Sequence, residues 1–166
     1  MAERTIVVDH KTMSYEGLFS AKELYQIVDK WFFDKGYDKS EKKNFEHVYP
    51  TGKQIELELW PWRKITDYAR IIMKVHFLMT NVKEVEIEKD SLKRRLNQGK
   101  VILTCNAYLE TDYEQKWESK AVFIFIRTLF DKFVYGVHMG RFDQQIIDEV
   151  NHMFFLVKGY LNTHRV

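Results

Sequence analysis

Side chains that could do chemistry are present in this chain, but they do not fall into a known catalytic or metal-binding spacing. No two of the six histidines are four residues apart, and no HExxH segment is present, so we predict ordinary polar or packed histidines and no metal site. The chain also lacks a Walker A segment and a GxGxxG segment, which argues against the common nucleotide-binding folds. We therefore expect no cofactor. The histidines are His10, His47, His76, His138, His152 and His164.

The single cysteine, Cys105, alternates along the chain with polar residues and has Leu103 and Ala107 as its apolar neighbours. Such a cysteine packs as a small hydrophobic side chain, and burial raises the pKa of its thiol. No GxSxG segment offers another nucleophile, so we predict no nucleophilic catalysis. One cysteine cannot form an intrachain disulfide, and nothing points to an oxidising compartment, so we expect a cytoplasmic protein.

Two kinds of charged cluster leave alternatives open. Glu110, Asp112 and Glu114 end an apparent strand, where neighbouring carboxylates could raise one pKa and create a general acid. Solvated carboxylates, or carboxylates paired with lysines, are the interpretation that we favour. Basic residues gather further upstream, and tryptophans flank Pro61; these residues could contact an anion or a partner, or could be a solvated loop and packed aromatics. The predicted contact residues are Lys93, Arg94, Arg95, Trp60 and Trp62.

Composition indicates one ordinary globular domain, residues 1–166, with 45% hydrophobic and 30% charged residues. The formal net charge of +2 is too small to indicate a nucleic-acid partner. The most apolar window, Ala121–Met139, contains Arg127, Asp131 and Lys132, so we predict no transmembrane segment. Peripheral contact with a membrane surface stays open.

Strict alternation of apolar residues predicts two long strands, one from Ala69 to Met79 and one from Val101 to Leu109. A strand over residues 4–15 should end at Gly17. Residues 44–49 and 54–60 should form a hairpin across Pro50–Lys53. Residues 82–96 are ambiguous: Val85 and Ile87 fit a strand, residues 91–96 could form a short helical turn, and residues 97–99 could form a hairpin loop.

Helical periodicity predicts a helix after Ser20, where Ser20 and Glu23 form a capping box, with Gly36 as its end. Near the C-terminus a first apolar stripe runs from Val122 to Phe133 and should dock on the sheet. A second stripe comprises Phe142, Ile146, Val150, Met153, Phe154, Val157 and Leu161. Gly136 and Gly140 lie between the stripes, so one kinked helix and two helices both remain open.

The predicted fold class is α+β, with an antiparallel sheet of about six strands wrapped on a long C-terminal helical region. The order of strand, helix, five antiparallel strands and C-terminal helical region resembles the helix-grip fold of the START and Bet v 1-like (SRPBCC) superfamily. That resemblance implies a cavity between sheet and helix, which often holds an apolar ligand or lipid. The residues expected to line it are Met73, Val75, Phe77, Cys105, Ala107 and Phe130.

We therefore expect a non-catalytic protein that binds an apolar ligand or lipid, or docks a protein partner. An enzyme of the cyclase or hydratase kind on the same fold is the first alternative, because fold alone does not decide function. A homo-oligomeric assembly protein is the second. Phe123 and Ile124 lie off the first apolar stripe, and we predict that they form a homodimer surface if no other element of the chain covers them.

Overall fold

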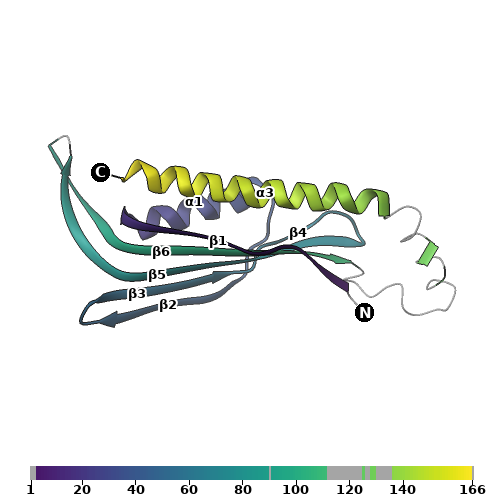
Figure 1. Cartoon of the computed structure of the whole chain (residues 1–166), viewed down its shortest axis with the longest axis horizontal. Helices are drawn as coiled ribbons and strands as arrows, with labels where there is room; N and C mark the ends of the chain where they lie inside the picture. The colour runs from purple at the N-terminus through teal and green to yellow at the C-terminus, as the bar shows by residue number, and fades with distance from the viewer. Residues whose placement is uncertain (1–2, 90, 112–124, 126–127, 130–135, 166) are drawn as a thin grey trace.

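The computed structural model describes residues 3–89, 91–111, 125, 128–129 and 136–165 (Figure 1). These residues form an α+β fold, a six-stranded antiparallel sheet with helices packed on one face, which confirms the predicted fold class. The sheet order is β1-β6-β5-β3-β2, and β4 pairs with β5. The elements are β1 (Glu3–Phe19), α1 (Ala21–Asp34), β2 (Glu41–Tyr49), β3 (Gly52–Leu59), β4 (Trp62–Lys64), β5 (Ala69–Lys89), β6 (Leu92–Thr111) and α3 (Gly136–Thr163).

The core lies between the sheet and the helices. The inward side chains of β5 from Ala69 to Met79 are at most 3% exposed, and those of β6 from Val101 to Leu109 are at most 1% exposed, as the alternation predicts. The stripe of α3 joins the same core, with Ile146, Val150 and Val157 fully buried. Side chains from both layers therefore fill this part of the interior.

The β5–β6 hairpin is longer than the sequence predicts. Lys89 pairs with Leu92, so the hairpin turns there; the predicted loop at residues 97–99 and the helical turn at 91–96 are wrong. Opposite charges face each other across the extension, Glu86 with Arg95 and Glu88 with Lys93. Such pairs stabilise an exposed two-stranded ribbon.

A bulge and a glycine explain how the hairpin bends. The register of β5 against β6 shifts between Thr80 and Lys83, where Asn81 has a positive φ of 54°. A Cβ on Gly99 would lie 2.8 Å from the carbonyl oxygen of Thr80, so this residue must be glycine because the backbone of the bulge in β5 lies against it. Gly17 pairs with Gly99 inside the sheet, so the prediction that Gly17 ends β1 is wrong. Figure 1 shows the hairpin curling toward the C-terminal end of α3.

Helix α1 begins where the capping box predicts, but only half of the box forms, because the Ser20 amide donates to the Tyr160 hydroxyl at 3.0 Å and not to Glu23. The hydroxyl of Ser20 accepts a hydrogen bond from the Glu23 amide at 3.3 Å. The Glu23 carboxylate accepts a bond from the Tyr160 hydroxyl at 2.9 Å, which ties α1 to α3. The helix ends at Asp34, and Gly36 follows with a φ of 73°, as the predicted stop requires.

The remaining predictions concern the β2–β3 hairpin and the C-terminal region. Tyr49 pairs with Gly52, which confirms the hairpin but shortens its loop to two residues.

Gly136 is the first residue of α3 and Gly140 lies inside it, so the helix is continuous through Gly140. From the first apolar stripe, Phe125 is 66% and Leu129 43% exposed, so the prediction that these two pack on the sheet is wrong. The stripe of α3 occupies that place.

Candidate functional site

The Trp60-Pro61-Trp62 segment links β3 to β4, and its rings lie on the outer face of the sheet, away from the helices. Trp62 pairs with Ile72, and Ile72 pairs with Tyr108 on the next strand; directly opposite residues share a face. Ile72 is only 6% exposed although it lies outside the main core. Its cover therefore comes from the outer face. We call Trp60, Trp62, Ile72 and Tyr108 the aromatic corner.

A basic side chain lies against each aromatic ring of this corner. The charged groups sit 5.5–5.8 Å from the ring centroids, a distance typical of cation–π contacts. The indole N–H of Trp60 also donates to a carboxylate oxygen of Glu58 at 2.7 Å. These contacts hold the rings half-buried and in fixed positions. The pairs are Arg4 with Tyr108, Arg70 with Trp62 and Lys74 with Trp60.

Glu110 borders the aromatic corner and is 5% exposed. Its carboxylate accepts hydrogen bonds from Arg70 and, at 3.0 Å, from Arg4. Burial raises the pKa of Glu110, but the bonds from these two guanidinium groups outweigh burial and leave the pKa lowered. A general acid would need a raised pKa, so the structure does not support that alternative at Glu110. Asp112 and Glu114 lie outside the described residues.

The residues predicted to line a ligand cavity lie in the core. Of these, Met73, Val75, Phe77, Cys105 and Ala107 are at most 1% exposed. Burial raises the pKa of the Cys105 thiol to about 12, against a small lowering by the Lys11 charge, which agrees with the structural role predicted for this cysteine. Phe130 lies outside the described residues. The ligand-binding role of this group stays a prediction.

The predicted basic cluster is exposed near the end of the β5–β6 hairpin. Lys93 lies opposite Glu88 and Arg95 opposite Glu86, with 3.2 Å between the Arg95 Nε and a Glu86 oxygen. Arg94 lies opposite Ile87. The carboxylates of β5 therefore balance most of the positive charge, which weakens the prediction of an anion contact here. The trio Lys93, Arg94 and Arg95 does not lie on the same part of the sheet as Trp60 and Trp62.

A buried polar network that the sequence analysis did not predict joins the C-terminal end of α1, β4 and α3. Glu149 of α3 is 8% exposed, and its carboxylate accepts hydrogen bonds from Tyr37 at 2.5 Å, Arg63 at 2.8 Å and Gln145 at 3.0 Å. Arg63 also donates to the Lys35 carbonyl at 2.7 Å and lies 4.6 Å from the centroid of the Tyr37 ring. The network therefore fixes β4 against both helices.

The contacts within this network fix the protonation states of Glu149 and Tyr37 at neutral pH. Burial raises the pKa of Glu149, but the bonds from Tyr37, Arg63 and Gln145 outweigh burial and leave it lowered. Burial also raises the pKa of Tyr37, and the bond to Glu149 raises it further. At neutral pH the first group is a carboxylate and the second a phenol. Neither has a pKa near the operating pH, which a general acid or base requires.

Sequence separation explains why the network was missed. Tyr37 and Glu149 are 112 residues apart, and Arg63 and Glu149 are 86 apart. One signal was present: Glu149 stands three residues after Ile146 and next to Val150, on the edge of the buried stripe. A charged residue at such a position needs a buried partner.

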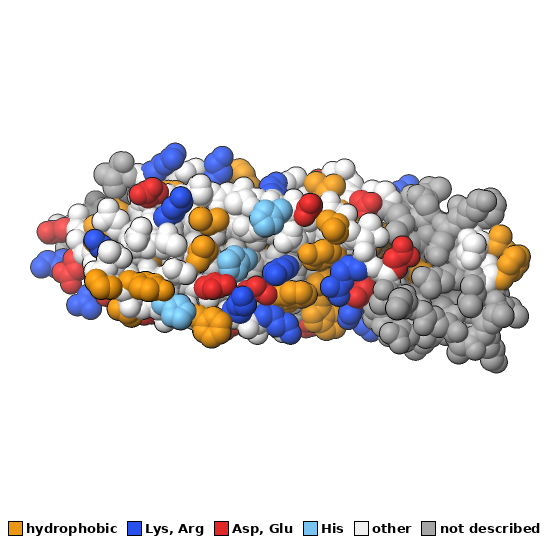
Figure 2. All heavy atoms as spheres, turned by 60° about the horizontal axis from the view of Figure 1, so that its bottom comes forward, with side chains coloured by type: hydrophobic (Ala, Val, Ile, Leu, Met, Phe, Trp, Pro, Cys, Tyr) orange, Lys and Arg blue, Asp and Glu red, His pale blue; other side chains and the backbone are white. Residues whose placement is uncertain are grey.

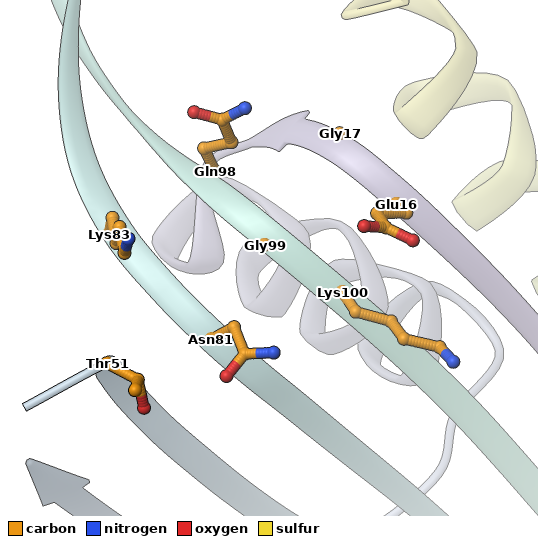
Figure 3. Close-up of a pocket in the computed structure, with 8 residues that line it drawn as sticks. All are labelled: Glu16, Gly17, Thr51, Asn81, Lys83, Gln98, Gly99 and Lys100. Atoms are coloured by element: carbon orange, nitrogen blue, oxygen red, sulfur yellow. The ribbon is translucent and has the colours of Figure 1, made fainter. Parts of the chain in front are cut away.

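Three of the hollows on the described surface lie apart from the predicted ligand residues. Figure 3 shows the first, about 840 Å³, with polar side chains such as Asn81 and Lys100 around the bend at Gly99. The second, about 670 Å³, lies on α3 beside Glu149. The third, about 430 Å³, lies between the β5–β6 hairpin and the end of α3. None of the three is lined by the predicted ligand residues.

Phe123 and Ile124, the predicted homodimer residues, lie outside the described part of the chain. Among the helices that the structure describes, none has the length and apolar character to span a bilayer. A search of protein-family models and of curated proteins found no match to this chain. The resemblance to the helix-grip superfamily therefore stays a prediction.

Proposed function

We propose that this chain is a non-catalytic binding protein that docks a protein partner on the aromatic corner. The observation that carries the proposal is the grouping of Trp60, Trp62 and Tyr108 on the outer face, outside the core, each with a basic side chain against its ring. Tryptophan, tyrosine and arginine are the residues most enriched at interface hot spots. Rings already held in place lose little conformational freedom when a partner covers them.

Charge favours a protein partner over a nucleic acid. Three cations of this region, Arg4, Arg70 and Lys74, stand beside two carboxylates, Glu58 and Glu110. Protein surfaces that bind nucleic acids carry a clear excess of positive charge. Figure 2 shows basic, acidic and histidine side chains interspersed among hydrophobic groups on the side of the molecule that carries β2 and β3. A mixed surface of this kind suits another protein.

Four buried groups beside the aromatic corner, in the polar network and in the core support the proposal of a non-catalytic protein; Asp143 of α3, whose pKa burial raises, is not among them. Glu110 and Glu149 have lowered pKa values, and Tyr37 and Cys105 have raised ones. Each group is held in the protonation state that it already has at neutral pH. The tuned pKa values that acid–base chemistry needs are shifted in the other direction.

The experiment truncates the corner and measures partner capture. The double variant Trp60→Ala, Trp62→Ala is compared with wild type and with Phe33→Ala, which removes an 82% exposed ring from α1. Partners captured from the native cell are identified, and their affinity is measured with purified proteins. Loss of a hot-spot tryptophan costs at least about 2 kcal/mol, so Kd should rise by at least about 30-fold for the double variant and stay unchanged for Phe33→Ala.

Folding is checked because Lys74 and Arg70 also lose ring contacts in the double variant. The variant Lys74→Glu reverses a charge at the edge of the corner and removes the cation that lies against Trp60 without truncating either ring, so it should weaken the same complex. Circular dichroism and thermal melts establish that each variant is folded. A partner that binds wild type and the folded variants equally well would overturn the proposal.

A further inference from the structure

Strand β2 is an open edge of the sheet. All nine of its residues are exposed, among them Phe45 (51%), Val48 (73%) and Tyr49 (51%). It is the last strand of the sheet order, and within the described residues no strand pairs with it on the side away from β3. The free N–H and C=O groups of such an edge are a template for another strand.

The bulge and the lysines that protect this edge are confined to its first residues, and Glu46 is the one carboxylate that follows them. A bulge lies between Glu41 and Lys43. Lys42 and Lys43 also lie there, and lysines on an edge strand discourage pairing with another strand. From Asn44 to Tyr49 the strand has neither lysine nor proline, and its pairing with β3 is regular. The regular part is therefore long enough to accept a second strand, with the Glu46 charge at its centre.

We propose that β2 pairs with β2 of a second copy of this chain, antiparallel and centred on Glu46. The regular part of the strand runs from Lys43 to Tyr49, and its midpoint is Glu46, so this register pairs all seven of its residues. A two-fold axis through that point makes the interface isologous. A register shifted by one residue in either chain would put inward and outward side chains on the same face.

The pairs formed in this register are complementary on the outer face. Phe45 comes opposite His47, two rings that already stand in one row with Tyr49 in each copy. Lys43 comes opposite Tyr49, which allows a cation–π contact. Centring on Phe45 instead would place Lys43 opposite His47 and leave Tyr49 outside the regular ladder. The complementary side-chain pairs and the number of paired residues therefore both favour the register centred on Glu46.

Glu46 opposite its own copy is the one unfavourable pair. In each copy its carboxylate lies 3.1 Å from the ammonium of Lys53, so two lysines flank the two carboxylates. Like charges directly opposite each other still destabilise a strand pair. The dimer is therefore weakened by Glu46, and no other register brings this residue against itself.

Pairing at β2 would place both outer faces on the same side of one continuous sheet, because directly opposite residues of antiparallel strands share a face. The two aromatic corners would then face the same direction. If the proposed function holds, a partner with two docking sites would bind with the gain that multivalency provides. The self-association itself does not depend on that function.

The test uses cysteine cross-linking. In this register the Cα atoms of the two copies of residue 46 are about 4.5–5.5 Å apart, within the range of a disulfide. With oxidised glutathione, Glu46→Cys should form a covalent dimer, and the control Val48→Cys should not, because residue 48 faces residue 44. The native Cys105 is buried and does not compete.

Sedimentation of the protein without added cysteines gives the second measurement. Wild type should dimerise with a measurable Kd, and Glu46→Gln should lower that Kd by up to about fivefold, since a like-charge pair costs roughly 0.2–1 kcal/mol. Phe45→Lys should raise it, and Phe155→Lys, at a 71% exposed position on α3, should not. A wild type that stays monomeric at millimolar concentration, or a Kd that Glu46→Gln raises or leaves unchanged, would overturn the proposal.

Discussion

Glu149→Gln is the substitution that best tests how the buried network holds the molecule together. Glutamine keeps the shape of the side chain but removes its charge and one of its acceptor oxygens. The donors from Tyr37, Arg63 and Gln145 at 2.5–3.0 Å would then compete for a single neutral acceptor. At least one donor loses its bond, and the Arg63 guanidinium loses its counter-ion.

The expected cost follows from these contacts. Breaking a fully buried ion pair costs about 3–5 kcal/mol, and a hydrogen bond to a charged group contributes about 1.5–3 kcal/mol. The Arg63 side chain is 19% exposed, so water reaches it and screens part of the loss. We therefore expect Glu149→Gln to lower the free energy of unfolding by about 2–3 kcal/mol, and Tm by roughly 5–10 °C.

Acid should reduce this difference. The pKa of Glu149 is lower in the folded protein than in the unfolded chain, so the unfolded state takes up the proton first as pH falls. Its contribution is fully present above the ordinary glutamate pKa of about 4.3 and is lost as pH falls through the folded value. Glu56 and Glu110 also have lowered pKa values, but both proteins share them, so the difference between wild type and variant isolates Glu149.

Urea unfolding from pH 7 down to pH 3 measures both effects. Asp148→Asn is the matched control, because it removes an exposed carboxylate from the neighbouring position of α3, bonded only to Gln144 among the described contacts. Its cost should stay within about 0.5 kcal/mol. The argument is refuted if Glu149→Gln costs no more than Asp148→Asn, or if its cost does not shrink on acidification.

Two further predictions concern the core and the first helix. Phe77 is 1% exposed, so Phe77→Ala should cost about 3–5 kcal/mol in denaturant unfolding; a cost near zero would show that this face lines an open cavity and would favour the apolar-ligand hypothesis. Ser20→Ala should lower stability by about 1 kcal/mol because the Glu23 amide loses its acceptor, and an unchanged thermal midpoint would contradict the cap.

The parts of the fold that the sequence predicted are those governed by local periodicity. Alternation from Ala69 to Met79 assigned every inward side chain correctly, because a strand buried on one face has a period of two. The cap at Ser20 and the stop at Gly36 were also correct, since both depend on residues within one helical turn.

Positions where the apolar alternation of a strand is interrupted were harder to interpret from the sequence. Asn81 and Gly99 break the alternation of β5 and β6, and the sequence pattern around Gly99 matches that of a loop. In the structure these residues form a bulge in β5 and a close approach of its backbone to Gly99, which leave the hairpin continuous to Lys89. A short polar segment with glycine is compatible with either outcome, and the tertiary register decides between them.

The candidate surfaces could be predicted only in part, for a different reason. Trp60 and Trp62 were singled out by residue type, but Ile72 and Tyr108, which complete the corner, come from strands whose register the sequence does not specify. Helices α1 and α3 pack on the inner face, so within the described residues the outer face is stabilised by its own side chains. Cation–π contacts do this at the aromatic corner, whereas no described residue covers β2, all of whose residues are exposed. The arrangement that completes the core thus leaves one ordered aromatic surface and one open edge, and these differ in what they can bind: side chains in the first case, and a backbone strand in the second.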